Sequence, residues 1–164
     1  MFIYKEKQVI DFIKESNAIE KEYSDQAVQS SLLAWDYLAG CIDQLSLKDI
    51  LCIHEIMLEM INPKIAGRLR SELKINVSVG LYNPPEYNKV PWQLSQWIFW
   101  VNKCDYKITE DINRLHIEFE KIHPFVDGNG RVGRLIWLWM RQLGELPFRV
   151  IKEAEKEEYY NWFV

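Results

Sequence analysis

The chain is short of cysteine, glycine, proline and long apolar runs. Its 164 residues include only three cysteines, seven glycines and six prolines. Cys41, Cys52 and Cys104 are odd in number and lack the spacing of a metal site, so we expect three reduced thiols in a cytoplasmic protein. The most apolar run, LIWLWM, is far too short to span a bilayer. The first residues also lack the sustained apolar stretch of a signal peptide. These absences predict neither a disulfide scaffold nor a membrane protein.

An excess of positive charge is also absent. Twenty Lys and Arg residues against 24 Asp and Glu residues give a net charge of −4, which argues against nucleic acid as a partner. What is present is typical of a soluble globular protein, with 48% hydrophobic and 27% charged residues. Seven tryptophans indicate an aromatic-rich interior. The length suits a single domain over residues 1–164.

Most of the chain has the apolar periodicity of helices. In the first twenty residues, apolar side chains from Val9 to Ile19 recur at helical spacing. Ser24 is a candidate N-cap for a helix that Gly40 ends, and Ser46 is a weaker candidate for the next helix start. The periodicity predicts helices over 27–40, 47–60, 92–102, 111–123, 131–144 and 152–164.

Residues 63–91 interrupt this helical pattern. Ile75, Val77 and Val79 alternate with polar residues, which is the period of a strand. Gly80 can make a turn, and residues 83–91 have the composition of an extended loop. The sequence therefore predicts a mainly α protein that carries one β-hairpin.

The stretch HPFVDGNGRVGR, residues 123–134, matches the pattern G-x-G-x-x-G at Gly128, Gly130 and Gly133. A dinucleotide-binding fingerprint needs a strand before these glycines and a βαβ unit around them. Here the preceding residues have helical periodicity, and no G-K-[ST] sequence of a phosphate-binding P-loop occurs. Both of those nucleotide-binding folds are therefore excluded.

The same stretch nevertheless has the chemistry of an anion site. The backbone of Gly128, Asn129 and Gly130 can form a nest of N–H groups at the positive end of a following helix. Arg131 and Arg134 can both reach a polyphosphate. Asp127 offers a hard oxygen ligand suited to Mg²⁺, and His123 can accept a proton near neutral pH. The alternative is a capped helix–turn–helix with solvated arginines.

The stretch resembles the Fic signature H-P-F-x-[DE]-G-N-G-R-x-x-R at every fixed position. AGRLR at 66–70, the prolines at 84–85 and VP at 90–91 resemble the flap of that family and its exit. EEYYNWF resembles the family's C-terminal helix. The resemblance implies a Fic fold, a helical bundle with a β-hairpin flap (residues 66–91) over the active-site loop (123–134). It also implies AMP transfer from Mg-ATP to a Ser, Thr or Tyr hydroxyl of a target protein.

The resemblance also implies roles for individual residues. His123 would deprotonate the hydroxyl, and Asp127 would hold Mg²⁺ between the α- and β-phosphates. The loop backbone over 128–130 would cradle the phosphates, with the Asn129 side chain on the α-phosphate. Arg131 would hold the β-phosphate and Arg134 the γ-phosphate.

Residues 1–22 resemble a self-inhibitory helix of the same family. Ser16 and Glu20 match its motif [ST]-x-x-x-E-[GN], whereas Lys21 departs from it. The resemblance implies that Glu20 pairs with Arg134, so that ATP cannot place its γ-phosphate productively. The alternative is an amphipathic helix with a solvated glutamate.

Several other side chains allow two interpretations. Tyr159 and Tyr160 could wall an adenine pocket or pack in the core. Phe125 is expected to bury its ring and anchor the loop. His54 and His116 are expected to be structural rather than catalytic.

The direction and nature of the reaction stay open. Removal of AMP, with Glu20 positioning water, is one alternative. Phosphate transfer on the same fold and a catalytically silent interaction module are others. A target protein would dock by strand addition, on flap residues Ile75, Asn76, Val77, Ser78 and Val79. The oligomeric state also stays open, since a Trp-rich surface such as 97–100 could serve a homodimer.

Overall fold

The computed structural model describes residues 4–42 and 44–163. Residues 1–3 of the predicted inhibitory segment and Val164 of the predicted last helix lie outside the described residues. The described residues are mainly helical. The helices are α1 (Glu6–Ile19), α2 (Asp25–Ala39), α3 (Leu47–Leu58), α4 (Val90–Val101), α5 (Thr109–Ile122), α6 (Asn129–Leu143) and α7 (Lys156–Tyr160), with short 3-10 turns at Tyr87–Lys89, Glu153–Glu155 and Asn161–Phe163.

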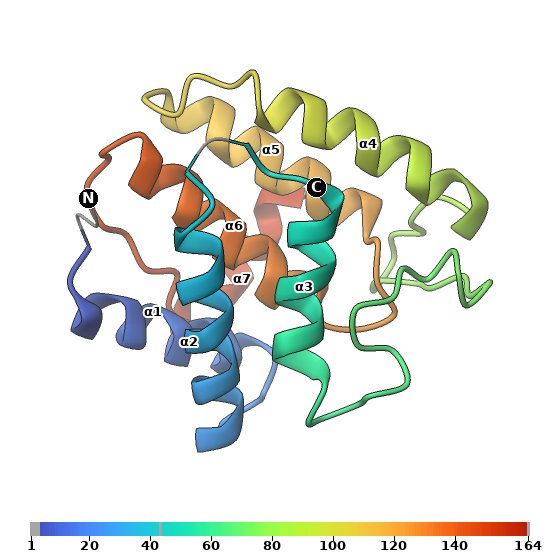
Figure 1. The fold of residues 1–164 in the computed structure, drawn as a ribbon, viewed down its shortest axis with the longest axis horizontal. Helices are drawn as coiled ribbons and strands as arrows, with labels where there is room; N and C mark the ends of the chain where they lie inside the picture. Colours follow the sequence, from blue (N-terminus) through green and yellow to red (C-terminus); the bar gives the residue numbers. More distant parts are fainter. Residues whose placement is uncertain (1–3, 43, 164) are drawn as a thin grey trace.

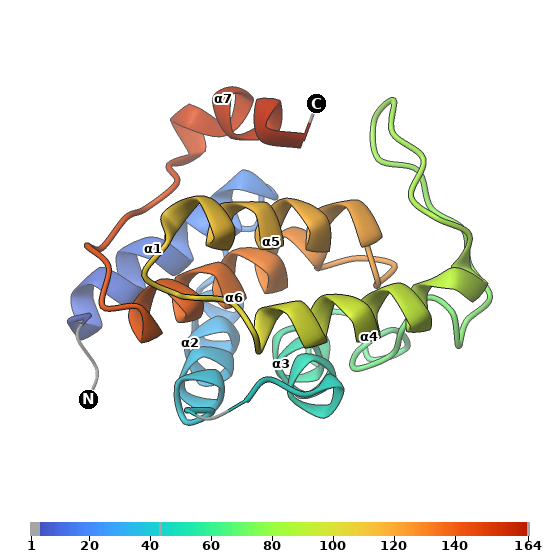
Figure 2. The same cartoon turned by 90° about the horizontal axis from the view of Figure 1, so that it is seen from above.

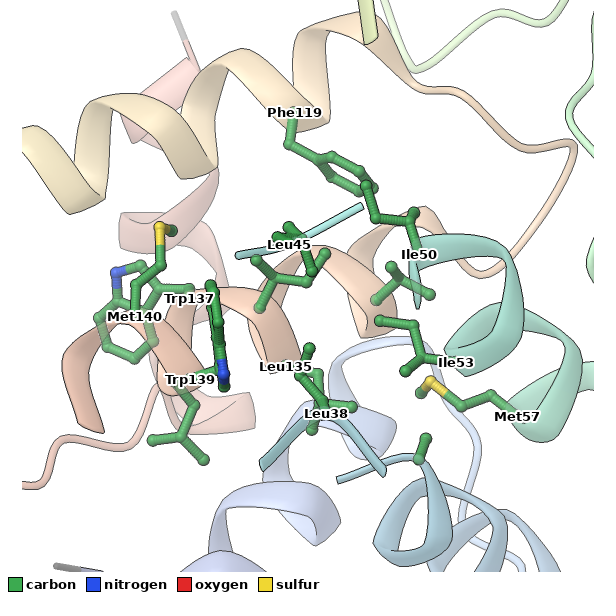
Figure 3. Close-up of a cluster of buried hydrophobic side chains, with 14 of the residues drawn as sticks. Leu38, Leu45, Ile50, Ile53, Met57, Phe119, Leu135, Trp137, Trp139 and Met140 are labelled. Carbon is green, nitrogen blue, oxygen red and sulfur yellow. The ribbon is translucent and has the colours of Figure 1, made fainter. Parts of the chain in front are cut away.

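Helix α6 is the centre of the bundle. It contacts α1, α2, α3 and α5, and α5 and the α2–α3 pair lie on opposite sides of it (Figures 1 and 2). Trp137, Trp139 and Met140 of α6 are almost wholly buried and point into the cluster shown in Figure 3. Since each such side chain stabilises the fold by about 1.5–3 kcal/mol, these residues hold the C-terminal half of α6 in the core, and the first turn of the same helix carries the end of the predicted catalytic loop.

Local caps fix several helix ends where the sequence predicts them. The Ser24 hydroxyl accepts a hydrogen bond from the Ala27 amide at 3.2 Å. Ser46 and Asp49 bond each other's backbone amides in a capping box. Gly40 and Gly144 are the C-caps of α2 and α6. The predicted ends of these helices are therefore confirmed, except that α3 ends two residues before the predicted position 60.

The flap segment, residues 66–91, does not contain the expected paired strands among the described residues. One isolated antiparallel bridge joins Val79 and Tyr82 around the turn at Gly80. Figure 2 shows this light-green segment, which connects α3 to α4 along the chain, projecting from the helical body beyond the start of α4. A two-stranded ribbon without a third strand is marginal in water. A regular strand over residues 75–79 and the full β-hairpin are therefore not shown.

The last predicted helix, 152–164, is also shorter than expected. Only Lys156–Tyr160 is α-helical. Segments this short have little helical stability of their own, so tertiary contacts decide their shape. The Glu153 amide donates to the Glu15 carboxylate at 2.7 Å, and the Tyr159 side chain is buried. None of the helices in 4–42 and 44–163 is long and apolar enough to cross a membrane.

Candidate functional site

The predicted catalytic loop joins α5 to α6, and both of its ends have left-handed backbone. His123 is the C-cap of α5 with φ 50° and ψ 62°. Gly128 is the N-cap of α6 with φ 80°. A β-carbon at position 128 would lie 2.9 Å from Leu58 Cδ2, so both backbone conformation and space require glycine there.

The His123 ring has the geometry of a proton acceptor. Its Nδ1 lies 3.2 Å from the carbonyl oxygen of Glu120. Because a carbonyl only accepts, this contact assigns the ring proton to Nδ1 and leaves the Nε2 lone pair available. Burial lowers the pKa of His123 from its usual value, which keeps the ring neutral at pH 7. The arrangement suits a general base.

Asn129 and Phe125 brace the loop from inside. The Asn129 carboxamide accepts from the Phe125 amide at 2.8 Å and donates to the Phe125 carbonyl at 3.0 Å. Phe125 is fully buried, as expected of an anchor. Since both ends of the carboxamide are engaged within the loop, its contact with an α-phosphate stays a prediction.

Asp127 and Arg131 face the open side of the loop. The Asp127 side chain is 62% exposed, and its Oδ2 lies 3.7 Å from Arg131 Nη2. Arg131 is buried and its Nε has no hydrogen-bond partner. The part of the chain that the structure describes holds no cluster of three or more metal-binding side chains. The Asp127 carboxylate accepts from the Gly128 amide at 2.6 Å and is otherwise largely exposed. One exposed carboxylate beside an arginine suits Mg²⁺ that takes its remaining ligands from phosphates and water.

Arg134 is bound by residues at the end of the N-terminal helix, the pairing that the family resemblance implies. Its guanidinium is buried and donates to the Ser16 hydroxyl and the Ser16 carbonyl, each at 2.9 Å. Its Nη2 also lies 2.7 Å from Glu20 Oε1. A side chain at Gly130 would run into the Glu20 carboxylate. Glu20 therefore lies over the glycine of the predicted phosphate cradle.

Lys21 adopts the backbone that its motif position requires. Its φ is 59°, and the amides of Lys21 and Glu22 donate to Ala18 and Asn17 carbonyls at 2.9 and 3.0 Å. These bonds form a Schellman motif, in which glycine or asparagine is the usual left-handed residue. Lysine pays roughly 1–2 kcal/mol for this conformation. Lysine at this position therefore makes the turn less stable than glycine or asparagine would, but the turn that holds Glu20 next to Arg134 is still formed.

The two C-terminal tyrosines have different surroundings. Tyr159 is buried, with its hydroxyl 2.7 Å from His116 Nε2 and its ring 5.6 Å from the Arg134 guanidinium. Burial lowers the pKa of His116 to about 3, so this histidine is a neutral part of the core. Tyr160 is 41% exposed, and its contact with an adenine ring stays a prediction.

His54 connects the start of the flap to the catalytic loop. Its Nδ1 accepts from the Gly67 amide at 2.9 Å, and its Nε2 lies 3.0 Å from the Asp127 carbonyl. The ring stacks on Phe125 with centroids 3.7 Å apart. Burial lowers the pKa of His54 to about 4. The histidine is structural, as the sequence predicts.

The flap side chains are mostly exposed. Ile75, Asn76, Ser78 and Val79 are exposed, whereas Val77 is partly buried. The flap is fastened to α5 near its turn, where the Tyr82 hydroxyl donates to the Lys121 carbonyl at 3.1 Å. Behind it lies a cleft of about 490 Å³, lined by Tyr82, Pro85, Trp92, Trp97, Trp100 and Lys121 among others.

Sequence patterns missed two charged residues, the buried Arg70 and the partly buried Glu120. Glu120 precedes His123 by one helical turn, and its Oε1 is buried without a hydrogen-bond partner. It packs against Gly133, where α5 and α6 approach closely. No sequence signal marks it, because a glutamate in an amphipathic helix usually faces water. Burial raises the pKa of Glu120 to about 7.

Glu120 is expected to make the protein less stable as the pH rises. An unfolded glutamate titrates near pH 4.5, so the unfolded state loses this proton first. The free energy of unfolding then falls between about pH 4.5 and pH 7, by up to about 3 kcal/mol. Glu120→Gln should remove this fall, as measured by urea unfolding at pH 5 and pH 8. Glu110→Gln, on the exposed first turn of α5, is the control. Equal pH dependence in wild type and Glu120→Gln would show that Glu120 is not protonated in the fold.

Comparisons with known proteins agree with the fold and the loop. The Fic/DOC family profile matches residues 44–140. The chain is 33% identical over 123 residues to protein adenylyltransferase fic-1 of Caenorhabditis elegans, which covers 72% of this chain and 23% of that protein. It is 28% identical over 136 residues to protein adenylyltransferase Fic of Drosophila grimshawi. That alignment covers 79% of this chain and 28% of that protein. The chain thus spans about a quarter of the length of these relatives.

Solved structures show the same fold. A Fic domain containing signalling protein from Bacteroides thetaiotaomicron superposes with a TM-score of 0.80 at 21% identity, over 94% of this chain and 70% of that one. A Fic family protein from Desulfovibrio desulfuricans gives 0.76 at 23% identity, over 94% and 55%. With the profile matching more than half of its length, the chain belongs to the Fic/DOC family.

Proposed function

We propose that this domain transfers AMP from Mg-ATP to a hydroxyl group of a target protein. The observation that carries the proposal is the loop itself. A neutral histidine with a free Nε2 lies in the same short segment as a backbone cradle and two buried arginines. The names of the curated relatives, protein adenylyltransferases, support the same reaction.

The residues divide the reaction between them. His123 Nε2 takes the proton as the hydroxyl oxygen bonds to the α-phosphorus, and the bond from the α-phosphorus to the bridging oxygen breaks to release pyrophosphate. The α6 N-terminus and Arg131 stabilise charge on the phosphates. Arg134 holds the γ-phosphate when Glu20 does not occupy it. Little covalent chemistry is needed, because positioning and charge supply most of the catalysis.

Label position separates this function from its alternatives. The protein is incubated with target proteins and with ATP labelled at either the α- or the γ-phosphate. AMP transfer attaches only the α label, and phosphate transfer attaches only the γ label. Attachment of neither, in a Glu20→Gly background, would contradict the proposal and favour a silent module or AMP removal.

Asp127 would hold the metal, which supplies charge neutralisation between the phosphates. Asp127→Ala is expected to lower the rate and weaken the dependence on Mg²⁺, because the lost carboxylate is a metal ligand. The measurement is initial rate against Mg²⁺ concentration. Asp105→Ala, a change of another surface aspartate whose side chain bonds only a local backbone amide, is the control. Equal metal dependence in wild type and Asp127→Ala would assign Asp127 a structural role.

We also propose that the N-terminal helix inhibits the site. Glu20 occupies Arg134 and lies over Gly130, where the terminal phosphates of ATP would otherwise bind. ATP then binds in poses that are not aligned for attack.

Target proteins are proposed to dock on the flap over residues 75–79. The backbone of Ile75 and Val79 is bonded within the chain, whereas residues 76–78 have no backbone partner among the described residues. The N–H and C=O groups of residues 76–78 can therefore pair with an added strand. Such pairing carries little side-chain information, which leaves serine, threonine and tyrosine as acceptors.

A further inference from the structure

Arg70 is a fully buried arginine beneath the catalytic loop. Its Nε donates to the His123 carbonyl at 2.7 Å, and its Nη2 donates to the Ile122 carbonyl at 3.3 Å. Its backbone amide donates to the Pro124 carbonyl at 2.9 Å. Within residues 4–42 and 44–163, no carboxylate forms an ion pair with it. The charge is therefore compensated by carbonyl groups, including those at the negative end of α5.

The same guanidinium also binds the flap on both sides of its turn. Its Nη1 donates to the Ile75 carbonyl at 3.4 Å, and its Nη2 donates to the Pro85 carbonyl. The Ile75 amide in turn donates to the Arg70 carbonyl at 3.0 Å. Ile75 begins the predicted docking residues, and Pro85 lies on the return of the chain. One planar group thus joins the catalytic histidine to both flanks of the docking segment.

This connection bears on the strained conformation of His123. A non-glycine residue in left-handed backbone costs about 1–3 kcal/mol and persists only when its surroundings hold it there. The bond from Arg70 Nε to the His123 carbonyl is the shortest hydrogen bond made by the His123 backbone. The guanidinium is planar and rigid, so its three N–H directions move together. A shift of the flap at Ile75 or Pro85 therefore moves the guanidinium that bonds the His123 carbonyl.

We infer that Arg70 is a positioning residue that sets the direction of the His123 ring and holds it in register with a target segment docked on the flap. The inference rests on the proposed AMP transfer. Arg70 touches neither ATP nor the hydroxyl, and it acts through the backbone of the loop and of the flap.

The central test compares Arg70→Lys and Arg70→Gln with Arg68→Gln, a change of a half-exposed arginine two residues earlier. All variants carry Glu20→Gly, and thermal unfolding verifies that they fold. Lysine keeps the charge but cannot bond the loop and both flap carbonyls at once. Both Arg70 variants are expected to lower kcat for target modification roughly 10²-fold, as displacement of a reacting group does, with the KM for ATP within about threefold of its starting value.

Two readouts do not depend on activity. NMR titration is expected to show a higher pKa for His123 in Arg70→Gln, since the Arg70 charge helps to lower the pKa of His123. In Arg70→Lys this pKa should move less. Hydrogen exchange of amides 75–85 should accelerate in both variants, whereas Arg68→Gln should change neither readout.

A variant that spares Arg70 guards against failure to fold. Pro85→Gly keeps the carbonyl that the guanidinium binds but removes the ring that fixes the backbone around it. The carbonyl is then held less firmly against Arg70, and the variant is expected to lower kcat on the target with ATP binding unchanged. An unchanged target rate in Pro85→Gly, or Arg70 variants with wild-type kcat and wild-type flap exchange, would overturn the inference. Absence of AMP transfer in the Glu20→Gly parent would instead refute the proposed function, and the titration and exchange measurements would still decide the role of Arg70.

Discussion

Replacing His123 with alanine is expected to lower AMP transfer by roughly 10²–10⁴-fold. The residue lies at the end of α5 with its Nδ1 next to the Glu120 carbonyl and its Nε2 free. Without it, no other described histidine is placed to accept the proton, because His54 and His116 are bound within the core. ATP binding should change little, since His123 contributes no cradle amide in this scheme.

The measurement is initial rate with α-labelled ATP in a Glu20→Gly background, over a range of pH. Burial lowers the pKa of His123, so the rate of the parent should fall only below about pH 6.5, as the base becomes protonated. His123→Asn is a useful second variant, because asparagine tolerates left-handed backbone better than alanine does. Retention of a tenth or more of the parent rate in either variant would exclude His123 as the base.

Replacing Glu20 with glycine is expected to raise AMP transfer ten- to hundredfold. Arg134 is buried and already bonded to Ser16 and Glu20. The γ-phosphate of ATP must therefore compete with Glu20 for the Arg134 guanidinium. Removal of the carboxylate shifts bound ATP toward the pose aligned for attack. The gain corresponds to about 1.4–2.7 kcal/mol, which one charge-assisted hydrogen bond can supply.

Two further variants make this result specific. Arg134→Ala should show no gain, because it removes the partner of Glu20 and the γ-phosphate contact together. Glu22→Gly removes a carboxylate that bonds the Ser24 amide two residues later, and it should leave the rate unchanged. A rate at or below wild type in Glu20→Gly would refute self-inhibition. A lower rate together with faster loss of AMP from modified target would assign Glu20 to AMP removal.

Patterns that act over a few residues could be predicted from the sequence. The caps at Ser24 and Ser46 and the glycine ends of α2 and α6 follow from local hydrogen bonding and backbone freedom. The loop over 123–134 is a contiguous motif, and its glycines and charged residues lie close together in sequence. Its position in the fold could therefore be predicted from the two helices that flank it. The contact of Glu20 with Arg134 joins two distant motifs, and only the resemblance to a known family connected them.

Tertiary packing decided the rest. The alternation of Ile75, Val77 and Val79 favours a strand, but a strand also needs a partner, and the described chain supplies only the bridge from Val79 to Tyr82. Arg70 and Glu120 have the residue types of a solvated surface. Arg70 is buried because the flap folds back on the end of α5, and Glu120 Oε1 is buried because α5 packs against Gly133. Periodicity records which face of an element is apolar. It does not record which distant carbonyl or glycine a charged side chain will contact. For His123, the contact that matters is the bond from Arg70 to its carbonyl.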